Sequence, residues 1–422
     1  MKVDYVEETS VRKALTFEVE PEVLEREIDQ RARDHARKAR LPGFRPGKVP
    51  AHVIRQRYRG QVIDEAVEAV VNRLVPPELE GRGLHPLAAP KLADLNHAEG
   101  QPLTFRIVFE TLPLVDLPEW RGLEARARQA QVSEEEVDKD LDALRQRNAD
   151  FDPVEGRAAQ PGDFCVVDLS WSPLDGGNGG RDENVLIELG GEGTAPEVRD
   201  ALLGALPGDT REAEVTTSGS GDAPPRTLRY TLALKSIKTR RLPELDDEFA
   251  KDLGDFETLG ALRDDLRRRR LQEAERAIDR EVKEALVDEL CRRAEFEVPE
   301  SLVERHMAAL TERLARSMSM QGIDPTKTGI DWKQMREAQR GAATRAAKAD
   351  VLLDELAKRE GVTVSAPELD AEVARYAQLM RQPKEQLRAR LEKDGDLSAL
   401  RVRIREEKTL DLLKANARLT FE

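Results

Sequence analysis

The chain has 422 residues and a formal net charge of −14 at pH 7; 36% of its residues are charged, 39% are hydrophobic and only 4% are aromatic. This length indicates about two to four domains, and the hydrophobic fraction suffices for several packed domains but not for one large core. The acidic balance argues against a broad affinity for RNA, because phosphates repel anionic surfaces.

The first 112 residues predict an α+β domain in which helices cover a sheet. Apolar and polar residues alternate in two segments, as in half-buried strands, and apolar residues recur at helical spacing between them. We expect the last of these helices to stop at Pro76-Pro77, because proline removes a helix hydrogen bond. In chain order, the predicted elements are a strand at 11–20, helices at 21–40, 51–60 and 62–74, and a strand at 103–109.

The first two helices are joined by the loop Leu41–Pro50, whose two glycines and three prolines exclude a helix. We expect the Phe44 side chain to be exposed or half-exposed because so short a loop cannot bury it, and Arg45 and Lys48 flank it with positive charge. This combination suits an anionic surface with apolar crevices, such as folded RNA with its protein coat. The local sequence also permits a plain connection whose Phe44 folds back onto the core.

The charge around this loop favours the docking interpretation. Residues 31–59 contain ten Lys and Arg and a single acid, Asp34, a net +9 within a chain of −14. A local basic tip on an acidic protein is an electrostatic footprint for a partner. A merely solvated basic face would usually interleave acids.

The run Gly43-Phe44-Arg45, Gly47-Lys48 and Pro50 resembles the ribosome-docking signature of the trigger factor family of bacterial chaperones. The resemblance implies that these six residues bind the ribosome; Pro46 stands where the family often has a basic residue. It implies the ribosome (protein and RNA at the exit tunnel) and nascent unfolded polypeptides as partners, with no membrane and no cofactor. A homodimer of the free protein stays open.

The segment 113–152 predicts a connector followed by a helix. Ser133 and Glu136 form a capping box at the start of this helix, and Val137, Leu141 and Leu144 form its buried stripe. The composition changes at Asp152-Pro153.

From 153 to 242 the chain is rich in glycine and reads as strands at 164–169, 185–189 and 228–234 with a short helix near 200–203. Gly176–Gly180 is a hairpin tip and not a phosphate loop, since no Gly-Lys-Ser/Thr follows. The strand Val166–Leu169, the run Pro196–Leu202 and the turn Pro207-Gly208-Asp209 resemble FK506-binding-type (FKBP-like) prolyl isomerase domains.

That resemblance implies an apolar, aromatic-lined pocket that holds proline and helps the amide cross a barrier of about 18–20 kcal/mol. The pocket positions fall on Leu169, Ala195, Val198 and Tyr230, so three of four are not aromatic, and the flap Thr217–Pro225 is small or polar. We expect an intact scaffold with a weak or absent isomerase activity, tested by a protease-free assay on an X-Pro-Phe peptide.

Residues 243–422 predict an almost entirely helical domain. Arg267–Arg270 predicts a solvated face rather than a second docking site, and His306 a packing or surface residue rather than a catalyst. Gly361 suits the end of a helix, Ser365 and Glu368 a capping box, and Asp394-Gly395 a break. The predicted helices are 255–291, one beginning at 299 and reaching 320, 332–360, one beginning at 365, and 399–413.

The trigger factor resemblance implies that these helices form arms which, with the linker helix around 133–150, enclose a substrate cradle. Five methionines in this region are soft side chains that suit weak binding of many apolar segments. Ordinary core filling is the alternative for each of them. They are Met307, Met318, Met320, Met335 and Met380.

The cysteines and histidines predict no metal site. Cys165 and Cys291 lie far apart, which indicates a reducing compartment, and the histidines lack metal-binding spacing. No apolar run approaches the roughly 20 residues of a membrane span, and Met1–Asp4 begins no signal peptide. The sequence therefore predicts a soluble cytoplasmic protein, in part ribosome-associated. The histidines are His35, His52, His85, His97 and His306.

Pattern and resemblance together predict a multidomain α+β protein. The domains are an N-terminal α+β ribosome-binding domain (1–112), a linker helix packing with the C-terminal domain (113–152), an inserted FKBP-like β-rich isomerase domain (153–242), and an all-helical chaperone domain with arms (243–422). The predicted function is ATP-independent chaperoning of nascent chains at the exit tunnel, assisting folding and export. The alternatives are a stand-alone prolyl isomerase with targeting domains, and an RNA-binding protein that uses the basic loop.

Overall fold

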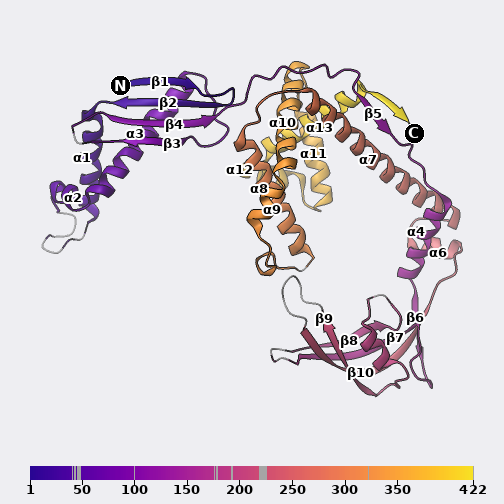
Figure 1. The fold of residues 1–422 in the computed structure, drawn as a ribbon. Coiled ribbons are helices and arrows are strands. Elements are labelled where there is room, and N and C mark those ends of the chain that lie inside the picture. The colour runs from indigo at the N-terminus through magenta and orange to yellow at the C-terminus, as the bar shows by residue number, and fades with distance from the viewer. Residues whose placement is uncertain are drawn as a thin grey trace. The chain divides into compact units, whose positions relative to one another are not determined.

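The computed structural model describes residues 1–39, 41, 44, 49–98, 100–174, 176, 179–191, 193–217, 226–321 and 323–421. They divide into two compact units, one of residues 1–125, 283–317 and 331–420, the other of 126–282, 318–330 and 421–422. The architecture is multidomain α+β, with a sheet-containing N-terminal part, a β-rich middle and a helical C-terminal part, as the sequence predicts (Figure 1).

The N-terminal sheet has the strand order β1-β2-β4-β3 with antiparallel neighbours. Phe17 of β2 lies opposite Phe105 of β4, and their rings stack with centroids 4.7 Å apart. The two inner strands were predicted, whereas the outer strands β1 and β3 were missed because neither shows a regular buried alternation. The strands are β1 Lys2–Glu7, β2 Arg12–Val19, β3 Lys91–Asn96 and β4 Leu103–Glu110.

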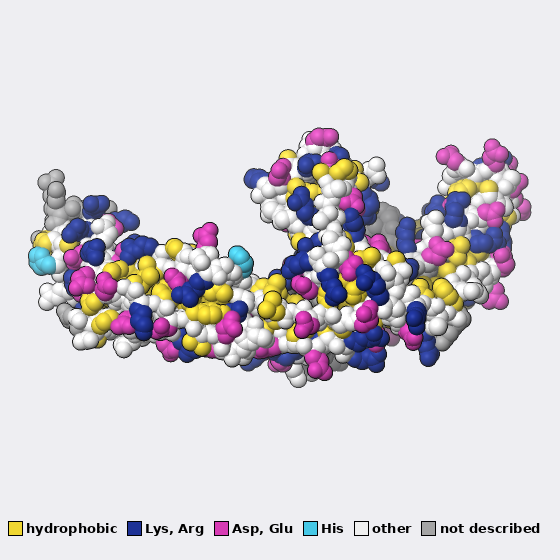
Figure 2. Space-filling view, turned by 90° about the horizontal axis from the view of Figure 1, so that it is seen from above, with side chains coloured by type: hydrophobic (Ala, Val, Ile, Leu, Met, Phe, Trp, Pro, Cys, Tyr) yellow, Lys and Arg dark blue, Asp and Glu magenta, His cyan; other side chains and the backbone are white. Residues whose placement is uncertain are grey.

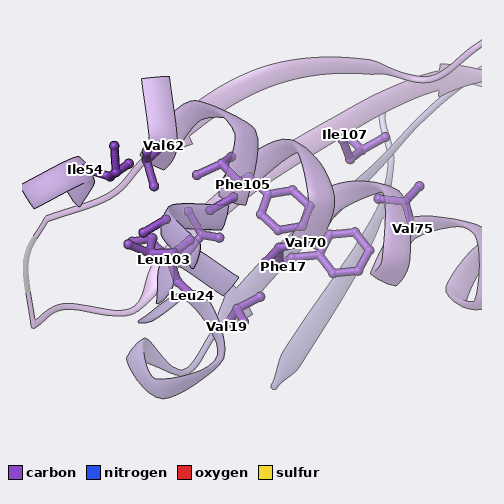
Figure 3. Close-up of a cluster of buried hydrophobic side chains, with 14 of the residues drawn as sticks. Phe17, Val19, Leu24, Ile54, Val62, Val70, Val75, Leu103, Phe105 and Ile107 are labelled. Atoms are coloured by element: carbon purple, nitrogen blue, oxygen red, sulfur yellow. The ribbon is translucent and has the colours of Figure 1, made fainter. Parts of the chain in front are cut away.

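Helices α1 and α3 cover the sheet and build the core of this domain (Figure 3). Leu24 and Ile28 of α1, with Val62 and Val70 of α3, pack against the buried face of β2 and β4. The periodicity thus predicted the correct buried faces. The helices are α1 Pro21–Lys38, α2 Ala51–Arg57 and α3 Arg59–Gly81.

Two helix boundaries in this domain were predicted wrongly. The helix expected at 51–60 ends at Arg57, because Tyr58 leaves helical geometry, and α3 begins at Arg59. Pro76-Pro77 lies inside α3, although each proline costs a helix interior about 3 kcal/mol. Val75 and Leu79 on either side are buried in the core, and this burial, about 1.5–3 kcal/mol per side chain, keeps the helix intact to Gly81.

The β-rich part forms a sheet in the order β6-β10-β7-β8, with β9 also paired to β10. Its core lies between this sheet and the short helix α5. The predicted strands and helix are confirmed, while β6 and β9 were missed. The elements are β6 Asp150–Val154, β7 Asp163–Pro173, β8 Gly180–Glu188, α5 Pro196–Leu202, β9 Thr210–Thr217 and β10 Arg226–Arg241.

The linker helix α4 (Glu134–Arg147) packs its predicted stripe against α6 (Asp247–Leu253) and the start of α7 (Leu259–Arg293). The capping box is confirmed: the Glu136 N–H donates to Ser133 Oγ at 3.3 Å, and the Ser133 N–H donates to the Glu136 carboxylate at 2.9 Å. Sequence reasoning missed α6.

Arg268–Arg270 are exposed, as the predicted solvated face requires, but the sequence did not predict the ion pairs of the run Arg267–Arg270. Each of the four guanidinium groups pairs with a carboxylate, and two of them tie α7 to acids of α4. The run therefore joins helices, although such partly exposed pairs contribute at most about 1 kcal/mol each. The pairs are Arg267 with Glu134 and Asp264, Arg268 and Arg269 with Asp265, and Arg270 with Asp140.

The C-terminal part is helical as predicted, with two corrections. The helix expected from 365 to the break at Asp394-Gly395 is divided, since α11 ends at Leu379 and α12 begins at Lys384. The helix expected over 332–360 is divided at Gln339, so α9 ends and α10 begins there. Gly361 and Gly395 take the positive φ values of 66° and 81° that end helices, and the capping box at Ser365 is present. The elements are α8 Glu300–Met320, η1 Pro325–Lys327, α9 Trp332–Ala338, α10 Arg340–Arg359, α11 Ala366–Leu379, α12 Lys384–Asp394 and α13 Asp396–Ala415.

Strand β11 (Arg418–Phe421) pairs with β5 (Glu124–Ala127). The Arg418 N–H donates to the Leu123 carbonyl at 2.8 Å, which fixes the end of the helical part to the connector after the N-terminal domain. Among the described helices, none is long and apolar enough to cross a bilayer.

Candidate functional site

Phe44 is held outside the core of the N-terminal domain. Its side chain is 40% exposed, while Leu41 before it and Val49 after it are buried in that core. The Phe44 N–H donates to the Leu41 carbonyl at 3.1 Å, and half-buried Pro50 caps the start of α2. The two ends of the loop are thus anchored while the aromatic ring between them stays accessible. The other predicted docking residues lie outside the described part: Gly43, Arg45, Gly47 and Lys48.

Acids outside the segment 31–59 offset part of its positive charge. Arg55 pairs with Glu25 and with Asp29, the latter at 3.0 Å, and Arg31 pairs with Glu27 at 3.0 Å. The +9 counted along the sequence therefore overstates the local field. Within the described residues of the segment 31–59, three exposed cations of α1 and α2 lack an ion-pair partner: Arg33, Lys38 and Arg57.

The base of the loop is braced between α1 and α3. His35 Nε2 lies 2.6 Å from the Glu65 carboxylate. This hydrogen bond holds the pKa of the Glu65 carboxyl below its ordinary value. Arg73 of α3 pairs with Glu27 of α1 at 3.0 Å, so α1, which leads into the loop, is tied to α3 at two levels.

The four positions of the expected isomerase pocket come together in the β-rich part. Leu169 lies opposite Leu232 across β7 and β10, and Tyr230 follows two residues before Leu232 on β10. Val198 of α5 is buried in the same apolar cluster, and Ala195 packs against it. All four residues therefore belong to or pack against one apolar cluster.

The other aromatic side chains of this domain are engaged elsewhere. The Trp171 ring lies against Gly180 so closely that a Cβ at position 180 would approach the ring to 2.2 Å. Phe164 meets Phe151 edge to face at 4.9 Å. Among the aromatic residues described between 160 and 240, Tyr230 alone packs against the apolar cluster, which therefore has an aliphatic character.

A buried carboxylate braces this domain. Asp163 accepts two hydrogen bonds from the Arg157 guanidinium, at 2.5 and 2.8 Å, and others from the Gln160 N–H and the Thr239 hydroxyl. Arg157 first, and then these other donors, hold the pKa of the Asp163 carboxyl below its ordinary value. Burial raises the pKa of the neighbouring Cys165 thiol to about 11, so this cysteine is unreactive at neutral pH.

Apolar side chains stay exposed on the helical part. Met320 is 84% and Met380 49% exposed, and Leu379 and Val402 are also accessible, whereas Met307 is buried between α8 and α10. Met318 and Met335 are half-buried. Core filling thus explains Met307 but not Met320 or Met380. Figure 2 shows such apolar side chains standing among charged ones on the exposed face.

His306 lies in a structural pair. Its Nε2 is 2.8 Å from the Asp350 carboxylate, which links α8 to α10. This contact supports the packing role that the sequence predicts. In the part of the chain that the structure describes, no group of three or more His, Cys, Asp and Glu side chains could hold a metal ion.

Two family models match the N-terminal and C-terminal parts of the chain. The family described as "Bacterial trigger factor protein (TF)" matches residues 1–144, and "Bacterial trigger factor protein (TF) C-terminus" matches residues 258–415. Neither of these two matches extends into the β-rich segment between them.

Whole-length relatives cover that segment as well. The chain is similar to the trigger factor of Solibacter usitatus, with 33% identity over 402 residues (94% of this chain, 95% of the relative). It is similar to that of Koribacter versatilis, with 34% identity over 419 residues (95% and 93%). A solved structure titled "Promiscuous Substrate Recognition in Folding and Assembly Activities of the Trigger Factor Chaperone" shares the fold, with a TM-score of 0.50, 23% identity and coverage of 98% and 99%.

Proposed function

The chain belongs to the trigger factor family of chaperones, and from this premise we propose that it docks on the ribosome at the exit tunnel and shields nascent chains without ATP. On this proposal it keeps emerging polypeptides open and assists their folding and export. The partners are protein and RNA of the ribosome and the unfolded chain itself.

The observation that carries the proposal is the exposure of Phe44 between two buried anchors. Burying an aromatic ring is among the largest apolar gains available to a side chain, yet this ring is left 40% exposed while Leu41 and Val49 go into the core. The free cations Arg33, Lys38 and Arg57 on the adjoining helices supply attraction to phosphates. Arg45 and Lys48 would add two charges in the loop itself.

The exposed apolar side chains of the helical part suit the second half of the proposal. Met320 and Met380 are flexible thioethers that adapt to many partners. Dispersed contacts of this kind bind extended apolar segments weakly and release them quickly. Because the sequence contains no nucleotide motif, we attribute client release to this weak binding and not to hydrolysis.

For the β-rich domain we propose the FKBP-like fold with little prolyl isomerase activity. The family resemblance implies an isomerase, but Leu169 and Val198 supply aliphatic walls where that resemblance implies aromatic ones, and Ala195 stands where it implies an isoleucine. An apolar pocket could still receive a proline ring, so the domain can bind prolyl segments better than it accelerates their isomerisation. The alternative of a stand-alone isomerase loses its main support for the same reason.

The test is co-sedimentation with ribosomes. The variant Phe44→Ala/Arg45→Ala/Lys48→Ala should no longer pellet with them, while its far-ultraviolet circular dichroism and melting temperature stay unchanged. Phe151→Ala is a matched control, since Phe151 is 37% exposed and lies in the β-rich domain. Unchanged co-sedimentation of the triple variant would refute ribosome docking by this loop. Equal salt dependence for naked RNA and for ribosomes would instead favour the alternative of a free RNA-binding protein.

A further inference from the structure

A cavity of about 620 Å³ opens in the N-terminal domain beside α2, the helix that follows the loop Leu41–Pro50. Its walls come from three parts of the chain: α1, the segment from α2 into α3, and the turn between β3 and β4. His52 of α2 lines the cavity two residues after the loop ends at Pro50, so the cavity adjoins this end of the loop, which we call its foot. A volume of this size lies in the range of small-molecule sites and is ample for a nucleotide.

The cavity has an apolar floor. Leu24 and Ile28 of α1, which belong to the core of the domain, line it together with the partly buried Ile63 of α3. A floor of this kind accepts the flat face of a ring and excludes a strongly hydrated group.

The rim has four polar side chains, beside the charged residues Glu25, Arg55 and Arg59 that also line the cavity. His52 and Gln56 of α2 stand on one side, and His97 and Gln101 of the β3–β4 turn on the other. All four are exposed, and within the described residues their side chains make no hydrogen bond. Imidazole and amide groups can both donate and accept, so the rim offers paired donors and acceptors around an apolar slot.

The unpaired cations lie on the helices that form the cavity walls and do not line the cavity itself. Arg55 lines the cavity and is held by Glu25 and Asp29, so it cannot serve as a free anion site. The unpaired cations Arg33, Lys38 and Arg57 belong to the same helices as the cavity walls. A ligand that suits the whole region therefore has a planar, hydrogen-bonding, uncharged part and phosphates at its edge.

We propose that this cavity receives an unpaired base of ribosomal RNA when the protein docks. The inference rests on the proposed docking function and names a second contact for it beside the Phe44 loop. Proteins recognise single-stranded RNA by this chemistry: splayed bases lie on flat or apolar side chains, and their edges bond to polar ones. A loop of a ribosomal protein is the alternative occupant, but it would supply no phosphates to pair with Arg33, Lys38 and Arg57.

The experiment has two arms, both with full-length protein and purified ribosomes. In the first, ribosome affinity is measured for His97→Ala/Gln101→Ala, for Phe44→Ala, and for the control His85→Ala, an exposed histidine outside the cavity. In the second, a photo-crosslinker replaces Gln101 in the otherwise unchanged chain. The crosslinked product is then digested with ribonuclease or with protease. The second arm leaves the other rim residues in place, so it does not depend on the folding of the double variant.

We expect the rim variant to bind about tenfold more weakly, because it loses the polar contacts to the edge of the base, and we expect the crosslink to fall on RNA. His85→Ala should bind like the unchanged chain. A crosslink to ribosomal protein alone, or unchanged affinity of the rim variant while Phe44→Ala weakens binding, would overturn the base pocket and leave docking intact. If Phe44→Ala also binds normally, the docking function itself fails.

Discussion

The loop at 41–50 and the β-rich domain both contain the residue pattern of a known type of site, and they place its residues in different surroundings. In the loop, Phe44 stays accessible while its neighbours Leu41 and Val49 are buried. In the β-rich domain, Leu169 and Val198 pack into or against the domain core as small aliphatic side chains. A motif side chain kept out of the core is available to a partner, whereas motif positions absorbed by packing mainly stabilise the fold.

The largest expected effect is a difference in stability between two Phe→Ala variants of the N-terminal domain. Phe17→Ala removes a fully buried ring stacked on Phe105 and should cost about 3–5 kcal/mol of unfolding free energy, enough to unfold a marginal domain. Phe44→Ala should cost less than about 1 kcal/mol. Urea denaturation followed by circular dichroism measures both; a large loss of stability for Phe44→Ala would mean that its ring is structural.

In the β-rich domain, the buried Asp163 carboxylate should contribute more to the free energy of unfolding than the residues of the expected pocket. Asp163→Asn leaves Arg157 without its anion and should cost about 2 kcal/mol, since the guanidinium is partly exposed. The folded-state pKa of Asp163 is lowered, so its stabilisation is complete above the ordinary carboxyl pKa and is lost as pH falls through the folded value.

Melting curves of the wild-type and Asn chains should therefore differ at pH 7 and converge in acid, below about pH 4. The wild-type chain should lose stability over this range through Asp163, and the Asn chain should lack that contribution. A constant difference down to pH 2 would show that the carboxylate charge is not what stabilises the domain.

An aromatic side chain introduced at a pocket position should restore part of the isomerase activity of the β-rich domain. Leu169→Phe should raise the rate of prolyl isomerisation of an X-Pro-Phe peptide by about tenfold over the unchanged chain, equivalent to about 1.4 kcal/mol of transition-state stabilisation. Leu186→Phe, at an exposed position of β8, is a matched control that adds a ring away from the cluster. Activity of the unchanged chain equal to that of a typical family member would contradict the aliphatic-pocket interpretation.

The smallest effects should come from the exposed apolar residues of the helical part. Met320→Ala and Leu379→Ala should each weaken binding of an unfolded probe protein by about threefold or less, because single contacts in a dispersed weak site contribute under about 1 kcal/mol. The buried Met307→Ala should instead lower the melting temperature. A loss of probe binding above tenfold from Met320→Ala alone would indicate one concentrated site.

The sequence predicted what local pattern determines. The apolar alternation of β2 and β4, the spacing in α1 and the capping boxes at Ser133 and Ser365 are each written in a few adjacent residues. Tertiary packing decided the rest. Pro76-Pro77 stays helical because Val75 and Leu79 are buried, and no short-range rule supplies that information.

The sites divide in the same way. The docking motif and the four pocket positions could be found from sequence because each follows a family pattern. The cavity at the foot of the loop could not, since its rim joins residues near 52 and near 100 that only the fold brings together. Ion pairs across helices, such as Arg55 with Asp29, likewise escape a count of charges along the chain.

The most direct test of the central claim is the ribosome dissociation constant of Phe44→Ala beside that of Phe151→Ala. The two side chains are exposed to nearly the same extent, 40% and 37%. We expect Phe44→Ala to weaken binding about 30-fold, as for a central aromatic contact, and Phe151→Ala to leave it unchanged. Equal affinities for the two variants would contradict docking through the exposed loop.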